Sequence, residues 1–322
     1  MFVGKSAEEE IPVPMWRTRV LALASATLVA VAACSSSAGS GSPSPSTAAS
    51  AAASGAASAS PSTAASAAAS TAVIPVPDEY KAKGEINWCS DMTYPPEEFL
   101  AADGSTPQGS DIDIASEIAK RLGLKARMTN TAGDLIIPAL LAKKCDTIIT
   151  GMNDTPERRL TMDFVDYLKA GQGLLVAAGN PKGIRTLEDL SGKSVAVQHT
   201  TTNEAALIAE NEKLKAAGKP LINIQAFQKD TDGFQQLALG RVDAYSTDSP
   251  VVAYYNSLPE NAGKFEIGGT PIEPVLVAMA FNKDNSGLRD AIQAAVDAMY
   301  ADGTLKAIID KWGMTNAVEL LK

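Results

Sequence analysis

The stretch CDTIITGMNDTPERR, residues 145–159, decides the fold class. Its first half is apolar throughout, as in a central strand of a parallel sheet, so we predict a buried strand over residues 145–152. The chain then changes to small polar residues and to charge. Thr155, Pro156 and Glu157 suit the N-cap, the first position and the first turn of a helix. The stretch therefore predicts a strand that is followed directly by a helix.

The same alternation extends outward along the chain in both directions. Period-2 or continuous apolar runs predict strands, and apolar residues at helical spacing predict helices. The predicted strands are residues 86–91, 125–130, 145–152, 194–198, 222–227, 243–248 and 275–282. The predicted helices are residues 111–123, 134–144, 203–218, 232–240, 249–258, 288–303 and 304–313. Strands alternating with helices indicate an α/β fold with right-handed crossovers, here in two blocks with a shared ending.

Polar residues follow four of these strands. The segments are SDMTY (90–94), TGMNDTPER (150–158), QHTTTNE (198–204) and STDSP (246–250). Open α/β sheets bind their ligands at the carboxyl ends of strands, close to helix N-termini. The first two segments belong to the first block and the others to the second. We therefore predict a cleft that is lined from both sides.

The N-terminal region has the pattern of a targeting segment. Residues 1–33 read as a signal peptide with a probable start at Met15, because Arg17 and Arg19 precede an apolar run of signal-peptide length. VAAC, residues 31–34, resembles a bacterial lipobox, which would make Cys34 a lipid-anchored first residue. The alternative is ordinary cleavage with an incidental cysteine. Residues 34–75 are rich in Ser, Ala and Pro and predict a disordered tether between anchor and folded region.

Composition and motif content exclude several functions. The chain has 28 Lys and Arg against 37 Asp and Glu, a formal charge of −9, which disfavours a nucleic-acid partner. Only one histidine is present, His199, and no cluster of metal ligands, nucleotide loop or Ser/His/Asp arrangement stands out. We expect no cofactor, no metal and no catalytic residue.

Two cysteines remain in the folded region. Cys89 lies near the carboxyl end of one predicted strand, and Cys145 lies just before another. If the two strands run parallel, the thiols sit at opposite ends and are too far apart for a disulfide. We therefore expect two unpaired, buried thiols.

Taken together, the motifs resemble the extracytoplasmic polar amino acid-binding proteins of ABC importers, in their lipoprotein form. The resemblance runs in order from DMTYPPEEF (91–99) through GSDIDIASEIAKRLG (109–123) and DLIIPALLAKKCDTIITGMNDTPERR (134–159), and on to ADGTLKAIIDKWG (301–313). It implies a type II periplasmic-binding-protein fold whose two lobes are mostly parallel sheets flanked by helices. It also implies a receptor that closes around a free amino acid or amino acid derivative.

The resemblance assigns the charged ends of the ligand. Arg158 matches the family's arginine that binds the ligand α-carboxylate. A guanidinium suits this role because it can donate two parallel hydrogen bonds to a carboxylate. Asp248 matches the acid that holds the α-ammonium. Thr201, Thr202 and Asn203 match the loop at a helix N-terminus that meets the carboxylate.

The remaining matched positions belong to the first block. Thr150, Gly151, Met152 and Asn153 match the strand end that contacts the ammonium. Asp91 and Tyr94 match the loop nearest the ligand side chain.

Two positions depart from the family pattern. Gly133 stands where an aromatic residue often stacks on the ligand, and Glu97 replaces a common Phe. The residues expected to contact the α-carboxylate and α-ammonium of the ligand match the family, whereas those expected to contact the ligand side chain differ. The identity of the ligand side chain is therefore left open.

Local chemistry alone allows other interpretations of these residues. Arg158 could be solvated, as we expect for Arg159, and Asp248 could cap the following helix. Tyr94 could be cleft wall, and His199 is more typical of a loop residue without a role. Glu97 and Glu98 are expected to be solvated.

The resemblance also implies a domain division and a mechanism. Residues 76–171 and 275–322 form the first lobe and residues 172–274 the second, with hinge crossings near 170–175 and 272–275. The protein is expected to be a monomeric, lipid-tethered receptor on the outer face of the cell membrane that delivers its ligand to an ABC permease. The alternatives are an enzyme on the same fold, similar to cyclohexadienyl dehydratase, and a ligand-binding sensor component.

Overall fold

A computed structural model describes residues 73–270 and 272–322 of the 322-residue chain. The predicted signal peptide, Cys34 and nearly all of the predicted tether lie outside the described residues. Among the described residues, no helix combines the length and the apolar character needed to cross a membrane.

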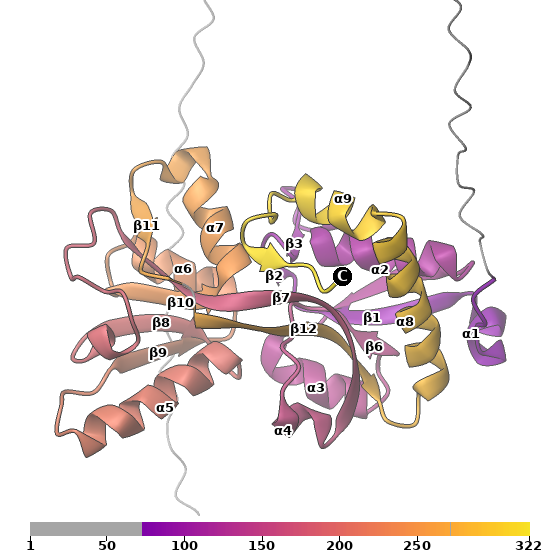
Figure 1. The fold of residues 1–322 in the computed structure, drawn as a ribbon, viewed down its shortest axis with the longest axis horizontal. Helices are drawn as coiled ribbons and strands as arrows, with labels where there is room; N and C mark the ends of the chain where they lie inside the picture. Colours follow the sequence, from indigo (N-terminus) through magenta and orange to yellow (C-terminus); the bar gives the residue numbers. More distant parts are fainter. Residues whose placement is uncertain (1–72, 271) are drawn as a thin grey trace, which may run out of the picture. The chain divides into compact units, whose positions relative to one another are not determined.

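Helices and strands alternate along most of the described chain (Figure 1). The α-helices are α1 (Asp78–Lys83), α2 (Ser110–Arg121), α3 (Gly133–Leu141), α4 (Pro156–Arg159), α5 (Thr202–Ala216), α6 (Asp230–Ala238), α7 (Ser249–Ser257), α8 (Ser286–Ala301) and α9 (Thr304–Lys311). Two short 3-10 helices are η1 (Glu188–Leu190) and η2 (Pro259–Asn261). The strands of the large sheet are β1 (Glu85–Ser90), β5 (Lys125–Asn130), β6 (Thr147–Ile148), β7 (Met162–Ala177), β8 (Ser194–Gln198), β9 (Asn223–Phe227), β10 (Ala244–Asp248), β11 (Phe265–Ile267), β12 (Ile272–Asn282) and β13 (Val318–Glu319). A separate small sheet holds β2 (Thr93–Tyr94), β3 (Glu98–Leu100) and β4 (Pro107–Gln108).

The large sheet has a parallel part at each end and an antiparallel centre. Its strand order is β5-β1-β6-β12-β7-β10-β8-β9. The pairs β5/β1/β6 and β10/β8/β9 are parallel, and β12 and β7 pair antiparallel between them. This confirms the predicted α/β class and two-lobed fold. We call the elements around β1, β5 and β6, with α1 to α4, α8 and α9, the first lobe, and those around β8 to β11, with α5 to α7, the second lobe.

The strands β7 and β12 run side by side between the two lobes (Figure 1). The hinge crossings predicted near 170–175 and 272–275 fall within β7 and at the start of β12, where the pairing register shifts between Ile272 and Val275. Both the hinge and the lobe borders stay predictions.

The sequence prediction of a strand over residues 145–152 is too long, because β6 contains only Thr147 and Ile148. After β6 the backbone leaves the sheet: the amide of Gly151 donates to Asp111 Oδ2 at 2.9 Å, and Gly151 has a φ of 54°. A Cβ at this glycine would lie 2.9 Å from the ring of Tyr94. The apolar run is thus divided between a short strand and a close turn under Tyr94.

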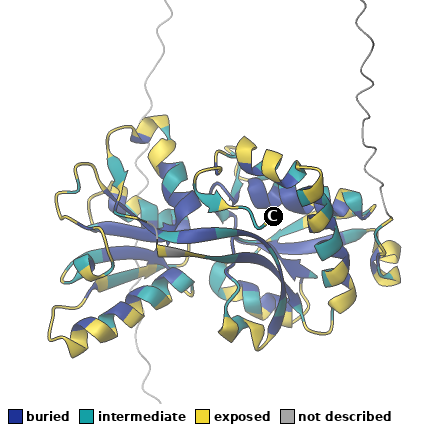
Figure 2. Ribbon diagram, viewed as in Figure 1, coloured by how far each residue is buried: buried dark blue, intermediate teal, exposed yellow. Residues whose placement is uncertain are grey.

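Each lobe has its own buried core. The inner strands β1, β6, β8 and β10 are almost entirely buried, whereas the edge strands β5 and β9 are partly exposed and the outer faces of the helices are exposed (Figure 2). In the first lobe, Trp88 and Phe281 are fully buried within the cluster that α2, α8 and α9 cover. In the second lobe, Tyr245 and Leu175 belong to the cluster beneath α6 and α7. The sheet and its helices therefore hold the strand ends of both lobes in place.

The prediction of unpaired thiols is wrong, because Cys89 and Cys145 form a disulfide with a Cα–Cα distance of 5.7 Å. The strands β1 and β6 are parallel, as assumed. Cys145, however, does not extend β6 in a straight line: it belongs to a bend that follows Lys143, a residue with a positive φ. The bend returns Cys145 towards Cys89, and both are buried beside α3.

Candidate ligand-binding site

A cavity of about 70 Å³ lies where strand ends of the two lobes face each other. The first lobe contributes the ends of β1 and β6, the small sheet and the start of α3, and the second lobe contributes the ends of β8 and β10 and the starts of α5 and α6. All eleven residues that the sequence predicts for the site line this cavity: Asp91, Tyr94, Thr150, Gly151, Met152, Asn153, Arg158, Thr201, Thr202, Asn203 and Asp248. Their binding role stays a prediction.

Arg158 is held at the cavity by the short helix α4. Thr155 caps this helix, its Oγ1 accepting from the amide of Arg158 at 3.3 Å, and Pro156 occupies the first helical position. The Arg158 guanidinium donates to the Asn153 carbonyl oxygen at 2.8 Å. Burial lowers the pKa of Arg158, against a smaller raising effect of Asp248. Arg158 therefore offers donors that remain after one bond to the backbone.

Arg159, the next residue, is directed elsewhere. Its side chain is 51% exposed and pairs with Asp154. The two adjacent arginines thus separate into one at the cavity and one at the surface.

Asp248 ends β10 on the opposite wall and is fully enclosed. Its Oδ2 accepts from the Tyr94 hydroxyl at 2.8 Å, and its Oδ1 accepts from Asn203 Nδ2 at 2.8 Å. It occupies the N-cap position of α7 but makes no side-chain capping bond. Burial raises the pKa of Asp248 above its usual range, while Asn203, Tyr94 and Arg158 act to lower it. The carboxylate therefore points to the cavity and not along the helix.

The start of α5 supplies the threonines. Thr201 is the N-cap, and its Oγ1 accepts from the Glu204 amide at 3.2 Å. The Thr202 hydroxyl donates to Asn153 Oδ1 in the first lobe. A helix N-terminus with free backbone N–H groups favours an anion. Arg158 and Asn153 of the first lobe thus meet the start of α5 of the second lobe, and together they form one electropositive region of the cavity.

A contact between the lobes explains the glycine at position 133. Gln198 Nε2, at the end of β8, donates to Asp91 Oδ2 at 2.7 Å, and the Gly133 amide donates to the same oxygen at 3.0 Å. A Cβ at Gly133 would lie 3.1 Å from both Asp91 Oδ2 and Gln198 Nε2. The space that an aromatic side chain would need is therefore taken by a hydrogen bond between the lobes.

The expectation that Glu97 and Glu98 are solvated is wrong, because the side chains are 4% and 0% exposed. Glu98 lies in the short strand β3, which folds back on β2 and carries its side chain inward to the cavity wall. Its Oε1 accepts from the Thr150 hydroxyl at 2.7 Å. That hydroxyl also accepts from the Asp91 amide at 3.0 Å, so Thr150 connects Glu98 to Asp91. The hairpin pairing, which the sequence pattern did not indicate, buries both glutamates.

Six further cavity residues had no individual assignment in the sequence: Ile136, Gln198, Thr200, Asp230, Ser246 and Thr247. Four of them belong to the polar strand-end segments 198–204 and 246–250, whereas Ile136 and Asp230 lie outside the predicted segments. Asp230 is fully buried at the first position of α6, where Tyr245 and Thr247 hydroxyls donate to its carboxylate. Burial raises the pKa of Asp230 to about 7. It follows the predicted strand 222–227, so the rule that ligands bind at strand ends could have found it. His199 lies at the cavity edge, where its ring nitrogen faces the Glu204 carboxylate at 3.0 Å.

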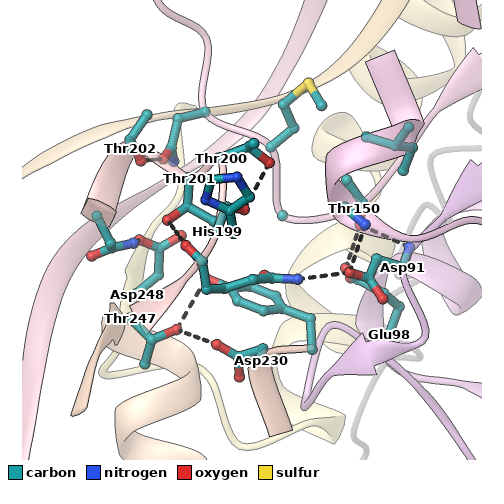
Figure 3. A pocket seen from close by; sticks show the side chains of 18 of the residues that line it. Asp91, Glu98, Thr150, His199, Thr200, Thr201, Thr202, Asp230, Thr247 and Asp248 are labelled. Carbon is teal, nitrogen blue, oxygen red and sulfur yellow. Dashed lines mark hydrogen bonds between the residues drawn. The ribbon is translucent and has the colours of Figure 1, made fainter. Parts of the chain in front are cut away.

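Figure 3 shows how the labelled cavity residues are distributed. Asp91, Glu98 and Thr150 gather on one side, whereas Thr202, Thr247 and Asp248 lie on the other. We call the surroundings of Arg158, Asn153, Asn203 and Asp248 the clamp end, and those of Asp91, Glu98 and Asp230 the acidic end. Two buried side-chain atoms at the clamp end have no partner among the described residues: Asn153 Nδ2 and Asn203 Oδ1. At the acidic end the Glu98 carboxyl lies against the buried carboxyl of Asp111, and burial together with this neighbour raises the pKa of Glu98 well above its usual range. The clamp end therefore retains unused hydrogen-bonding capacity.

The described residues hold no group of three or more His, Cys, Asp or Glu side chains with the arrangement of a metal site. The cavity chemistry is that of several carboxyl groups, one guanidinium, amides and hydroxyls.

Comparisons with known proteins show which family the chain resembles. A family model described as bacterial extracellular solute-binding proteins, family 3, matches residues 86–315. The histidine-binding periplasmic protein of Escherichia coli (strain K12) is 33% identical over 229 residues, which cover 69% of this chain and 85% of that protein. The L-cystine-binding protein of the same strain is 29% identical over 236 residues, covering 73% and 85%.

Two solved structures are similar in fold and sequence. An ancestral arginine-binding protein bound to arginine has a TM-score of 0.65 and 38% identity, covering 71% of this chain and 98% of that chain. An ancestral amino acid-binding protein described as a precursor of cyclohexadienyl dehydratase has a TM-score of 0.65 and 34% identity, covering 73% and 98%.

Proposed function

Because the chain belongs to the bacterial extracellular solute-binding proteins, family 3, we propose that it is an extracytoplasmic receptor that binds a free amino acid and delivers it to an ABC importer. One relative named above is a histidine-binding periplasmic protein and another is an L-cystine-binding protein, which supports an extracytoplasmic location and a role in amino acid import. The ligand is an amino acid or a derivative that keeps both the α-carboxylate and the α-ammonium.

One observation carries the proposal: the clamp end places opposite charges on opposite walls of one cavity. Arg158 and the start of α5 suit a carboxylate, and Asp248 suits an ammonium. The unpaired Asn153 Nδ2 is a donor for the carboxylate, and the unpaired Asn203 Oδ1 is an acceptor for the ammonium. An α-amino acid is the small molecule that presents these two groups one carbon apart.

We propose that binding works by hinge closure. Hydrogen bonds already join the lobes around the cavity, among them those of Tyr94 to Asp248, Gln198 to Asp91 and Thr202 to Asn153. A ligand must enter while these are parted and must replace or add to them on closing. The differential contact of a ligand that touches both lobes favours the closed form. The crossings near 170–175 and 272–275 are where we expect the backbone to bend.

A thermal-unfolding screen of the purified protein against free amino acids tests the proposal. A ligand present at about a thousand times its Kd adds about 4 kcal/mol to the free energy of unfolding, which is a clear rise in Tm. The proposal is wrong if no amino acid, opine or small peptide raises the Tm.

We propose that Cys34 carries a lipid that tethers the protein to the outer face of the cell membrane. The support is the lipobox pattern at residues 31–34 and the low-complexity tract that follows it. Cys34→Ala should move the protein from the membrane fraction to the soluble fraction. Retention of the variant in the membrane fraction rules out this anchor.

Delivery to a permease by a monomeric receptor is the last part of the proposal. Deleting the gene should lower uptake of the radiolabelled ligand, and re-expression should restore it, whereas a pure sensor leaves uptake unchanged.

Analytical ultracentrifugation should give the mass of one chain with and without ligand. A dimer in either state contradicts the monomer assignment.

An enzyme on the same fold is the second candidate. The likeness to a precursor of cyclohexadienyl dehydratase favours it, as does Asp230, whose pKa of about 7 is suited to a general acid. Asp230 is, however, held by two hydroxyls and by the start of α6. Incubation with cyclic amino acid precursors, followed by the absorbance of an aromatic product, decides between the two. Turnover that Asp230→Asn abolishes makes the protein an enzyme.

A further inference from the structure

The long strand β7 changes its pairing partner at one residue, Gly171. On one edge of β7, Lys169 and Ala170 pair with β13, whereas Gln172 and the residues after it pair with β10. Ala170 and Gln172 also pair with β12, so β13 and β10 both lie along the edge opposite β12. Gly171 is therefore the residue that stands between the two pairings.

The two partners along this edge belong to different lobes. β13 is part of the C-terminal segment, in which Met314 belongs to the core of the first lobe and Val318 packs against it. β10 leads into α7, and Tyr245 and Val252 from these two elements belong to the core of the second lobe. A hinge motion near residues 170–175 therefore moves β13 and β10 relative to each other.

One hydroxyl group joins the strand, the C-terminal segment and the second lobe. Ser249 is the first residue of α7 and is 8% exposed. Its Oγ accepts from the Gly171 amide at 3.1 Å and donates to the Ala317 carbonyl oxygen at 2.7 Å. Ala317 directly precedes β13. The hydroxyl thus satisfies two backbone groups at the point where β7 passes from one lobe to the other.

We infer that Ser249 is a positioning residue for lobe closure: its hydroxyl holds α7 against the first lobe and so keeps the preceding residue, Asp248, at the cavity. This inference rests on the proposed function, and it adds a residue that sets the balance between open and closed forms. When the lobes part, α7 moves away from Ala317, and the bonds of the hydroxyl are exchanged for bonds to water. The hydroxyl therefore stabilises the closed form more than the open form.

A second contact between α7 and the first lobe has a different character. The ring of Phe99, in β3, lies 6.0 Å from that of Tyr254 in α7 and 5.8 Å from that of Trp312, measured between ring centroids. A contact between rings tolerates a small rotation of the helix, whereas a hydrogen bond weakens steeply when its angle changes. Ser249 is thus the contact of α7 that is sensitive to the angle between the lobes.

Single-molecule energy transfer between the lobes of the purified protein tests the inference. Cysteines for the two dyes replace Leu141 in α3 and Lys215 in α5, which are exposed residues on helices whose first turns face the cavity from opposite lobes. Cys34→Ala removes the remaining free thiol, because Cys89 and Cys145 are disulfide-bonded. The ratio of closed to open molecules is measured without ligand and with rising concentrations of an equimolar mixture of the twenty standard amino acids.

Ser249→Ala should lower the ligand-free ratio of closed to open molecules about tenfold, because it leaves two backbone groups without their partner in the closed form alone. The concentration of the mixture that closes half of the molecules should rise by the same factor. Ser257→Ala is the matched control, because this hydroxyl of α7 also donates to a carbonyl oxygen, that of Tyr254 at 2.8 Å, but is exposed and stays within the helix. It should change both quantities less than twofold.

The outcomes separate the inference from the proposed function. A variant that only displaces Asp248 needs more of the mixture to close but keeps the ligand-free ratio. That result, or an equal change in both serine variants, overturns the role of Ser249 while leaving amino acid binding intact. A wild-type protein that the mixture does not close refutes the proposed function instead.

Hydrogen exchange of the wild-type protein decides the matter if Ser249→Ala does not fold. The Gly171 amide should exchange at least tenfold more slowly in the mixture than without it, since closure restores its bond to Ser249. The amides of Leu174 and Val176, which lie where β7 pairs within the second lobe, should change less than twofold. An equal rate for Gly171 with and without the mixture overturns the inference.

Discussion

The two ends of the cavity differ in their balance of charge, although both are built from charged and hydrogen-bonding side chains. At the clamp end the charges balance, because Arg158 faces the wall that holds Asp248. At the acidic end Asp91, Glu98 and Asp230 have no cation opposite them among the described cavity residues. A balanced end suits the part that all amino acids share, whereas an unbalanced end selects among them. Under the proposed binding mode, recognition of the amino acid class and recognition of the individual member take place at separate parts of the fold.

The largest effect should come from the clamp end. Arg158→Ala should weaken binding of every amino acid about 100- to 1,000-fold, because it removes the partner of a desolvated carboxylate. The matched control is Arg159→Ala, which should change affinity less than twofold, because Arg159 is exposed and bound to Asp154. Titration calorimetry measures both. Loss of affinity for only some of the amino acids that bind would erase the distinction between the two ends.

The second-largest effect should be the pH dependence of ligand affinity, which should differ between the two ends of the cavity. Burial, together with the carboxyls of Asp111 and Glu97, raises the pKa of Glu98 well above its usual range, and the pKa of Asp230 is raised to about 7. Lowering the pH therefore makes the acidic end less negative, which weakens its attraction for any cationic side chain. The affinity for L-arginine, used as a cationic probe, should rise between pH 5 and pH 8, by up to about tenfold per pH unit for each proton released.

L-citrulline, which has nearly the same shape as L-arginine but an uncharged side chain, supplies the control for the pH effect. Asp248, whose pKa is also raised by burial, serves both ligands equally, so the ratio of the two affinities reports on the acidic end alone. This ratio should increase with pH. A ratio that is constant from pH 5 to pH 8 contradicts a role for ionised carboxyls at that end.

A smaller effect is expected from Gly133→Ala. The added methyl group would lie 3.1 Å from Asp91 Oδ2 and Gln198 Nε2, so their hydrogen bond must lengthen by a few tenths of an ångström. We expect an approximately threefold to tenfold loss of affinity, since one hydrogen bond to a charged group is weakened and not removed. Calorimetry on this variant beside Arg158→Ala ranks the two ends directly. A loss as large as that of Arg158→Ala would reverse the ranking.

The disulfide should affect neither end. Cys89 and Cys145 close a segment with a sequence separation of 56 residues and are buried beside α3. Reducing the bond should lower the free energy of unfolding by about 4 kcal/mol on the loop-entropy account. Denaturant unfolding with and without a reductant measures this, and the affinity of the reduced protein should stay within twofold. A tenfold loss of affinity would connect the bond to the site.

The sequence predicts the fold and the clamp end well, for physical reasons. The alternation of strands and helices is a local pattern, and the cap Thr155-Pro156 before Arg158 is local chemistry. The polar strand ends around Asn153, Thr202 and Asp248 converge because carboxyl ends of strands in open α/β sheets form a common edge. Asn153, Arg158, Thr202 and Asp248 all line the cavity.

The acidic end could not be predicted in the same way, because it depends on contacts between distant segments. Glu98 is buried by pairing of β3 with β2 and by Thr150, 52 residues away. Asp91 is held by Gln198, 107 residues away. The disulfide depends on a bend at Cys145 that no periodicity records. Asp230 is the exception, because it follows a predicted strand. The rule that ligands bind at the carboxyl ends of strands could therefore have identified it.

A crystal structure of the protein with the amino acid that gives the largest rise in Tm tests the central claim most directly. The account predicts both carboxylate oxygens of the ligand within hydrogen-bonding distance of Arg158 and the start of α5, and the ammonium within the same distance of Asp248. The side chain should point to the acidic end. A ligand bound in the opposite orientation, or in another cavity, would contradict the account.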